Sequence, residues 1–163
     1  MTRNFEKLKD HILSLSEADD FDAARKEWDL INVEVSEELG KCPCGQSIKE
    51  HCHIRNNLNG NTTWVGNVCI KRFIGINTGQ LFAGLKRIVQ NPSANPNEDL
   101  IIYADEFGYI YSKEEYQFLM NIRHKRNQSQ KQIAWKKKIN RRIINKIVVQ
   151  KHSGSKTKLS LNL

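Results

Sequence analysis

All four cysteines of this 163-residue chain lie within residues 41–73, KCPCGQSIKEHCHIRNNLNGNTTWVGNVCIKRF, together with two of its five histidines. Thiols and imidazoles at this density can form a disulfide staple, a reactive thiol or a metal site. The N-terminus turns acidic where a signal peptide would need an uninterrupted apolar segment, so we expect a cytoplasmic protein. In a reducing cytoplasm, clustered cysteines more often serve as metal ligands or catalytic thiols than as disulfides.

A single structural Zn²⁺ is the cofactor that this segment favours. Four thiolates would fill its tetrahedral coordination, and closed zinc sites are structural rather than catalytic. Strand alternation places His51 and His53 on the face opposite Cys52. Three roles therefore remain open for the two histidines: surface residues, ligands in place of Cys52, or a further function. The candidate ligands are Cys42, Cys44, Cys52 and Cys69, with His51 and His53 as alternates.

The elements that must position these ligands follow the order knuckle, β-hairpin, helix. Residues 51–56 and 62–66 are predicted strands joined through Asn59-Gly60, a pair that tolerates the positive φ of a tight turn. A short helix over 68–76 follows, with Asn67 as its N-cap. The Cys-x-Cys spacing at Cys42 requires a tighter turn than the usual Cys-x-x-Cys knuckle.

Hydrophobic periodicity predicts the flanking elements. Helices are expected over 4–15 and 16–30, then a strand over 30–35 with Ile31, Val33 and Val35 on one face. Further helices are expected over 79–92, 97–110, 112–127 and 129–149, with Ser112 capping the third of these.

The predicted fold class is α+β: a small zinc-ribbon or treble-clef-like module flanked by N-terminal helices and a basic C-terminal helical region. We divide the chain into acidic helices (1–29), the zinc module with its following helix (30–90), the basic helical region (97–150) and a disordered tail (151–163).

Charge is distributed unevenly along the chain, whose formal net charge is +8. Residues 1–40 carry five Lys/Arg and eleven Asp/Glu, whereas residues 116–163 carry thirteen Lys/Arg and no Asp/Glu. Such a basic concentration is a candidate surface for nucleic acid, although a merely solvated tail is the alternative. The candidate contacts are Arg55, Trp64, Lys71, Arg72, Arg123, Lys125, Arg126, Lys131, Lys137, Lys138, Arg141 and Arg142.

Motifs of several enzyme classes are absent from the sequence. It has no Walker A loop, GxSxG elbow, H-E-x-x-H helix or zinc-deaminase signature. An HNH-like metal-dependent nuclease is the enzymatic alternative, because such enzymes wrap a hairpin and a helix around a metal ion. Asn67 and Cys69, rather than a histidine, occupy the helix start here. No apolar run is long enough to cross a bilayer, and nothing indicates a small-molecule substrate.

The string CPCG…IKE.C.IRN..NGNT..VGNVCIKRFIGI, preceded by ARKEWDLINVEV, resembles a group of poorly characterised small proteins from bacteria, phages and mobile elements. These proteins carry a four-cysteine zinc-ribbon-like module that closes with V-G-N/S-x-C-I-x-x-F, and the resemblance covers residues 23–76. It implies Cys42, Cys44, Cys52 and Cys69 as ligands and a nucleic-acid context, but no reaction.

We therefore predict a non-enzymatic, zinc-stabilised nucleic-acid-binding protein, with DNA favoured over RNA, that is accessory to phage, mobile-element or DNA metabolism. The alternative is an adaptor or inhibitor of a nucleic-acid enzyme, whose acidic N-terminal helices dock on a basic protein partner.

Overall fold

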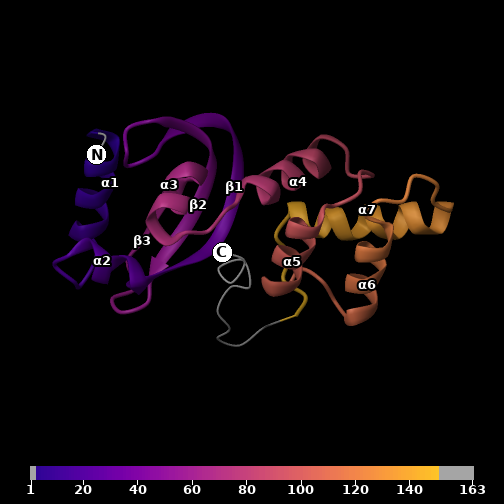
Figure 1. The fold of residues 1–163 in the computed structure, drawn as a ribbon. Helices are drawn as coiled ribbons and strands as arrows, with labels where there is room; N and C mark the ends of the chain where they lie inside the picture. Colours follow the sequence, from indigo (N-terminus) through magenta and orange to yellow (C-terminus); the bar gives the residue numbers. More distant parts are fainter. Residues whose placement is uncertain (1–2, 151–163) are drawn as a thin grey trace. The chain divides into compact units, whose positions relative to one another are not determined.

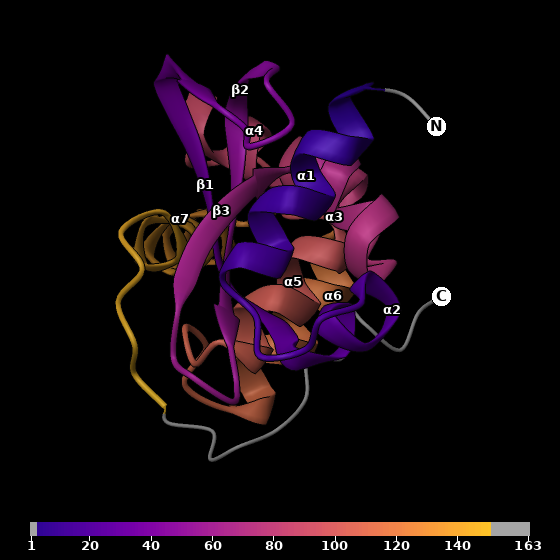
Figure 2. The same ribbon diagram turned by 90° about the vertical axis from the view of Figure 1, so that its left-hand side faces the viewer.

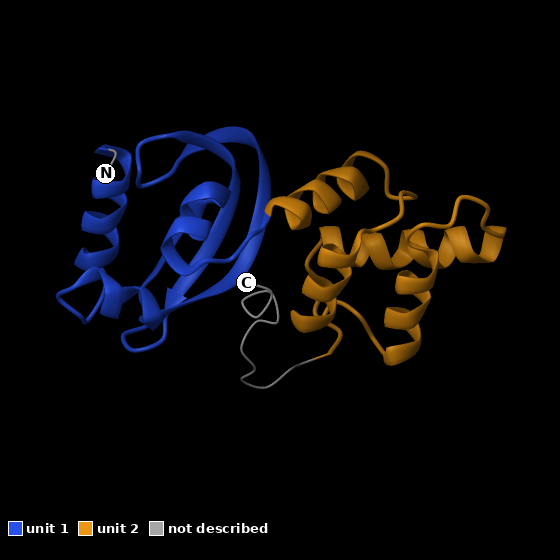
Figure 3. Cartoon of the chain, in the orientation of Figure 1, with its two compact units in different colours: residues 1–78, 162–163 blue, residues 79–161 orange. Residues whose placement is uncertain are grey.

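The computed structural model describes residues 3–150, and the chain divides into two compact units between Thr78 and Gly79 (Figure 3). The described chain is α+β, with seven α-helices and one three-stranded antiparallel sheet. The sequence grouped residues 30–90 in one domain, whereas the structure places 79–90 in the second unit. The predicted tail over 151–163 lies outside the described residues. Over residues 3–150, every helix is too short or too polar to span a lipid bilayer.

Unit 1 contains the sheet, whose strand order is β1-β2-β3. Helices α1 and α3 lie on the same side of this sheet in both views (Figures 1 and 2). The predicted hairpin and short helix are confirmed, although α3 begins at Asn67 and Gly66 takes the N-cap position. The elements are α1 (Arg3–Ser14), α2 (Phe21–Ala24), a 3-10 helix (Arg25–Glu27), β1 (Trp28–Lys41), β2 (Ser47–Asn56), β3 (Thr62–Gly66) and α3 (Asn67–Ile74).

The helix-covered face of the sheet forms the core of unit 1. Val33, Cys52 and Val65 are aligned across the three strands, and all are fully buried. Apolar burial of this kind stabilises a fold by about 25 cal/mol per Å². The helices contribute further fully buried side chains to unit 1, namely Leu8, Ile12, Ile70 and Phe73.

The second predicted helix is much shorter than expected. Asp20 caps α2 by accepting a hydrogen bond from the Ala23 N–H, but the helix ends at Ala24. Trp28 then opens β1 instead of ending a helix. Its indole donates to Ser16 Oγ at 2.9 Å, and its ring meets Phe73 edge-on. This tertiary packing outweighs the local helical preference of residues 25–30.

A bulge at Ile31 changes which residues of β1 face the core. Leu30 pairs with Ile54 and Asn32 with His53, so Ile31 is the extra residue. Leu30 and Val33 are consequently buried, while Ile31 and Val35 are only half-buried. The predicted shared face is therefore correct for Val33 and Val35, between which the register is unbroken, and wrong for Ile31.

Unit 2 is helical. It contains α4 (Gly79–Gln90), α5 (Glu98–Glu106), α6 (Lys113–Ile122) and α7 (Gln130–Ile144). Ser112 caps α6 as predicted, by accepting from the Glu115 N–H. Helix α7 ends at Ile144, short of the predicted residue 149, and Lys146 follows with a positive φ of 53°. The Val149 N–H donates to the Gly108 carbonyl at 2.7 Å rather than within a helix.

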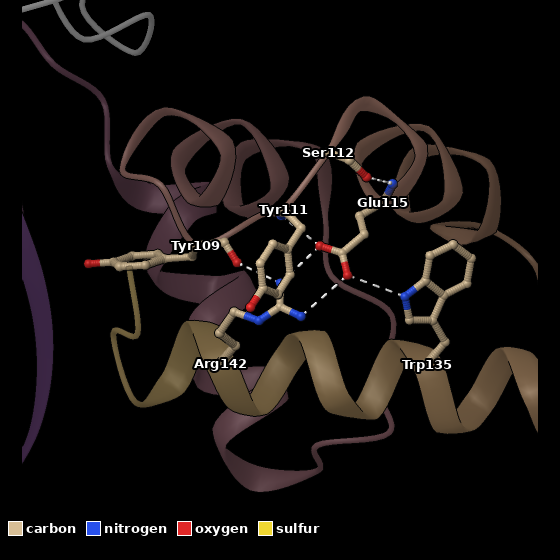
Figure 4. A network of polar contacts seen from close by, with 6 residues as sticks. All are labelled: Tyr109, Tyr111, Ser112, Glu115, Trp135 and Arg142. Carbon is tan, nitrogen blue, oxygen red and sulfur yellow. Dashed lines mark hydrogen bonds and ion pairs between the residues drawn. The ribbon is translucent and has the colours of Figure 1, made fainter. Parts of the chain in front are cut away.

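A buried ion pair joins α6 to α7 (Figure 4). The Arg142 guanidinium donates to Glu115 Oε1 at 2.8 Å and to the Tyr109 carbonyl at 3.0 Å. Trp135 Nε1 and the Tyr111 N–H also donate to the Glu115 carboxylate. Arg142 is only 7 % exposed. Of the predicted nucleic-acid contacts, Arg142 is thus one whose guanidinium is engaged by Glu115 inside the unit.

We predict that Glu115→Gln lowers the free energy of unfolding of unit 2 by about 3 kcal/mol, since it leaves the Arg142 charge buried without its partner. Denaturant unfolding followed by Trp135 fluorescence measures the loss. The matched control is Glu114→Gln on the exposed face of the same turn, which should change stability by less than about 0.5 kcal/mol. Equal effects of the two substitutions would contradict the assignment.

Acid should weaken the same pair. Burial raises the pKa of Glu115, but the hydrogen bonds from Arg142, Tyr111 and Trp135 outweigh it and hold the pKa below its usual 4.5. The stability that the pair contributes is thus present above pH 4.5 and is lost as the pH falls through the lower folded pKa. Unfolding measured from pH 6 downward should show a smaller acid-induced loss for Glu115→Gln than for the unmodified chain.

Candidate metal centre and basic hollow

Three of the four cysteines converge in unit 1. Cys42 and Cys44 lie in the β1–β2 connection, and Cys69 lies in the first turn of α3. Their sulfur atoms all lie within 4.8 Å of one another, and the Cys42 and Cys69 Sγ atoms are 3.6 Å apart. Two sulfurs on one tetrahedral zinc ion would be about 3.8 Å apart. We call Cys42, Cys44 and Cys69 the cysteine cluster.

A tight turn brings the first two cysteines together. The Gly45 N–H donates to the Cys42 carbonyl at 2.8 Å, and the Cys42 N–H donates to the Gln46 carbonyl at 2.9 Å. Gly45 has φ +100°, which only glycine adopts without strain. This geometry fits the tight turn that the Cys-x-Cys spacing requires.

Hydrogen bonds within the cysteine cluster shift the pKa values of its thiols. The pKa of Cys42 is lowered to about 5, because its sulfur is hydrogen-bonded with Cys69 and accepts from the Gly66 N–H, and these interactions outweigh burial. The pKa of Cys69 is raised by the same interaction with Cys42 and by partial burial. A metal cation that binds here would displace the thiol protons. All four cysteines are free, so the disulfide alternative is not realised in the described chain.

Cys52 lies outside the cysteine cluster. Its side chain is fully buried on the helix-covered face of β2, where its sulfur contacts Thr78 Oγ1 at 3.9 Å. Burial raises its pKa to about 12. The structure thus brings together three of the four predicted ligands.

A cavity of about 180 Å³ adjoins the cysteine cluster. Cys44 and Cys69 line it together with Asn4, Gln46 and Arg72. Three thiolates satisfy three of the four positions of a tetrahedral ion. A water molecule from this cavity has room to take the fourth position.

His51 and His53 lie on the opposite face of the sheet, as the strand alternation predicts. His53 is aligned with Trp64, and Arg55 with Thr62, across the β2–β3 pair. The His51 and Trp64 rings stack with centroids 5.1 Å apart. One face of the β2–β3 hairpin therefore carries His51, His53, Arg55 and Trp64.

Unit 2 has a hollow of about 460 Å³ with cationic walls, which we call the basic hollow. Of the predicted contacts, it brings together Arg123, Lys125 and Arg126. Its other walls include His124 and Lys136. Lys136 is only 4 % exposed, and its ammonium group donates to Asn95 Oδ1 at 2.9 Å and Gln128 Oε1 at 2.8 Å. Burial lowers the pKa of this amine.

The remaining predicted contacts do not form one surface. Arg55, Lys71 and Arg72 are exposed in unit 1. On α7, Lys131, Lys138 and Arg141 are exposed and Lys137 is half-buried. Trp135 stacks on Phe118 with ring centroids 4.1 Å apart. The Trp135 side chain nevertheless stays 38 % exposed.

The sequence assigned no role to Glu34, His124 or Lys136. Alternation along β1 could have placed Glu34 on the face of His51 once the strands were aligned. No local signal marks Lys136, because its partner Asn95 lies far away in the chain.

Comparisons of this chain with protein-family models, curated proteins and solved structures find no match. The resemblance to four-cysteine proteins stays a prediction.

We predict that Cys69→Ala releases the bound metal and lowers the melting temperature, because a ligand of the cysteine cluster is lost. Cys52→Ala should retain the metal, although the cavity it leaves costs some stability. Metal content after exhaustive dialysis, with a thermal melt of each variant, provides the comparison. Loss of metal from Cys52→Ala alone would contradict the three-cysteine geometry.

Proposed function

We propose that the protein binds nucleic acid through the basic hollow of unit 2 and that a zinc ion held by the cysteine cluster stabilises unit 1. The observation that carries the proposal is the buried ammonium group of Lys136 inside a wall of further cations. We assign a binding function and no catalysed reaction, and we favour DNA over RNA.

The partners of Lys136 are the reason to place an anion in the basic hollow. Asn95 and Gln128 offer amide oxygens, which hold the ammonium group in position without neutralising it. A buried cation without a compensating charge costs free energy. A phosphate group entering the basic hollow would supply that charge and would also meet Arg123, Lys125 and Arg126.

The loop that carries these cations is held in place by the same amides. Asn95 Nδ2 donates to the Lys125 carbonyl at 3.0 Å, and Gln128 Nε2 donates to it at 2.9 Å. Gln128 also donates to Asn95 Oδ1 at 2.8 Å. A pre-ordered loop loses little entropy when it binds, which favours affinity.

Zinc is the ion that we propose for the cysteine cluster. Thiolate ligands at a 3.6 Å spacing match tetrahedral zinc, and the ion would connect the β1–β2 turn to the start of α3. The proposal gives the metal three sulfurs and a water molecule, rather than the four sulfurs that the sequence favoured. It also places the protein in a zinc-ribbon-like class.

The test is fluorescence anisotropy with labelled single- and double-stranded DNA and RNA. We expect affinity to fall steeply with salt, because phosphate contacts release counterions. The double variant Lys125→Glu/Arg126→Glu should bind on the order of tenfold more weakly and should lower the slope of log affinity against log salt by about 2.

The matched control is Lys49→Glu, which reverses an exposed charge on β2 in unit 1. This variant should bind like the unmodified chain. Equal weakening in both variants would show that only overall charge matters and would overturn the proposed site. No binding above that of a basic peptide would overturn the function and favour the protein-adaptor alternative.

A further inference from the structure

The face of the sheet opposite α1 and α3 carries a second group of metal-ligating side chains, Glu34, His51 and His53. One ligand atom of each lies within 4.8 Å of those of the other two. We propose that these three residues form a second metal site, separate from the cysteine cluster, for a divalent transition ion such as Zn²⁺, Ni²⁺ or Co²⁺. The proposal does not rest on nucleic-acid binding.

The strand register explains why the three residues meet. Glu34 on β1 is aligned with His51 on β2, so their side chains project from the same face. His53 follows His51 by two residues and returns to that face. His53 Nε2 and Glu34 Oε2 lie 3.1 Å apart. Two ligands on one tetrahedral zinc ion with N/O donors would be about 3.3 Å apart, so the pair is already at coordination distance.

One tautomer of His51 suits a metal ion. Its Nε2 lies 3.3 Å from the Ile48 carbonyl, which can only accept a hydrogen bond. In the tautomer that donates from Nε2 to this carbonyl, the lone pair of Nδ1 is free to bind an ion. Histidines that bind metals commonly donate their second ring nitrogen to a backbone carbonyl in this way.

Neighbouring residues fix both imidazoles. The Trp64 ring stacks on His51 at 5.1 Å and meets His53 edge-on at 5.9 Å. Gly40 lies against the His51 ring, because a Cβ at position 40 would come within 2.8 Å of Nε2. Glycine at this position therefore admits the ring. Such preorganisation lowers the entropic cost of binding an ion.

The chemistry of the three ligands suits a borderline divalent ion. Imidazole binds zinc, nickel and copper well, and two histidines with one carboxylate occur at catalytic zinc sites that keep an open position. On the side of His53, the group adjoins a hollow of about 520 Å³ that His53 and Trp64 line. A fourth coordination position filled by exchangeable water would distinguish this site from a closed structural one.

The experiment titrates the zinc-loaded full chain with Ni²⁺ and follows binding by calorimetry and tryptophan fluorescence. We expect one additional ion to bind without release of zinc to a chromophoric indicator, and to quench Trp64. His53→Ala and Glu34→Gln should each weaken Ni²⁺ binding by at least about tenfold. Glu34 is 46 % exposed, so its substitution leaves the fold intact.

Two further variants complete the test. Gly40→Ala keeps all three ligands but displaces the His51 ring, so it should also weaken Ni²⁺ binding. His124→Ala removes a histidine of unit 2 and should leave binding unchanged. Three results would each overturn the proposal. They are the binding of no additional ion by the unmodified chain, Ni²⁺ binding by both His53→Ala and Glu34→Gln as tight as that of the unmodified chain, and nickel uptake matched by zinc release.

Discussion

The approach of Cys69 to Cys42 and Cys44 is the constraint on which unit 1 depends. These residues come from a turn between two strands and from the start of a helix that follows the third strand. Two sulfur atoms 3.6 Å apart are too far for a disulfide, but their spacing suits two ligands of one metal ion. A cation between them would fix the turn to α3, and α3 in turn buries Phe73 against Trp28. The metal would thus connect the knuckle to the aromatic core of unit 1.

The two faces of the sheet in unit 1 carry chemically different side chains. The covered face holds Cys52 among aliphatic side chains, where burial keeps its thiol protonated. The opposite face presents Glu34, His51 and His53 beside Trp64. Because strand residues alternate, neighbours in sequence such as His51 and Cys52 belong to different environments. A segment that is dense in ligands therefore need not form one site.

The sequence predicted the segments well and the partners only in part. The hairpin, the following helix and the cap at Ser112 depend on local signals, and the structure has them. The exclusion of Cys52 from the cysteine cluster depends on tertiary packing, which no spacing rule contains. The bulge at Ile31 moves Leu30 inward, although an unbroken alternation favoured Ile31. On α7, the distinct roles of Arg142 and Lys136 come from contacts with Glu115 and Asn95, which lie far away in the chain.

The most direct test of the central claim is X-ray absorption fine structure at the zinc edge, on the full chain loaded with one equivalent of zinc. The account predicts three sulfur atoms at about 2.3 Å and one lighter atom, since the cysteine cluster supplies three thiolates. Four sulfurs would show that Cys52 moves to join the metal. A shell of nitrogen and oxygen alone would show that the cysteine cluster is not the zinc site, and either result would contradict the account.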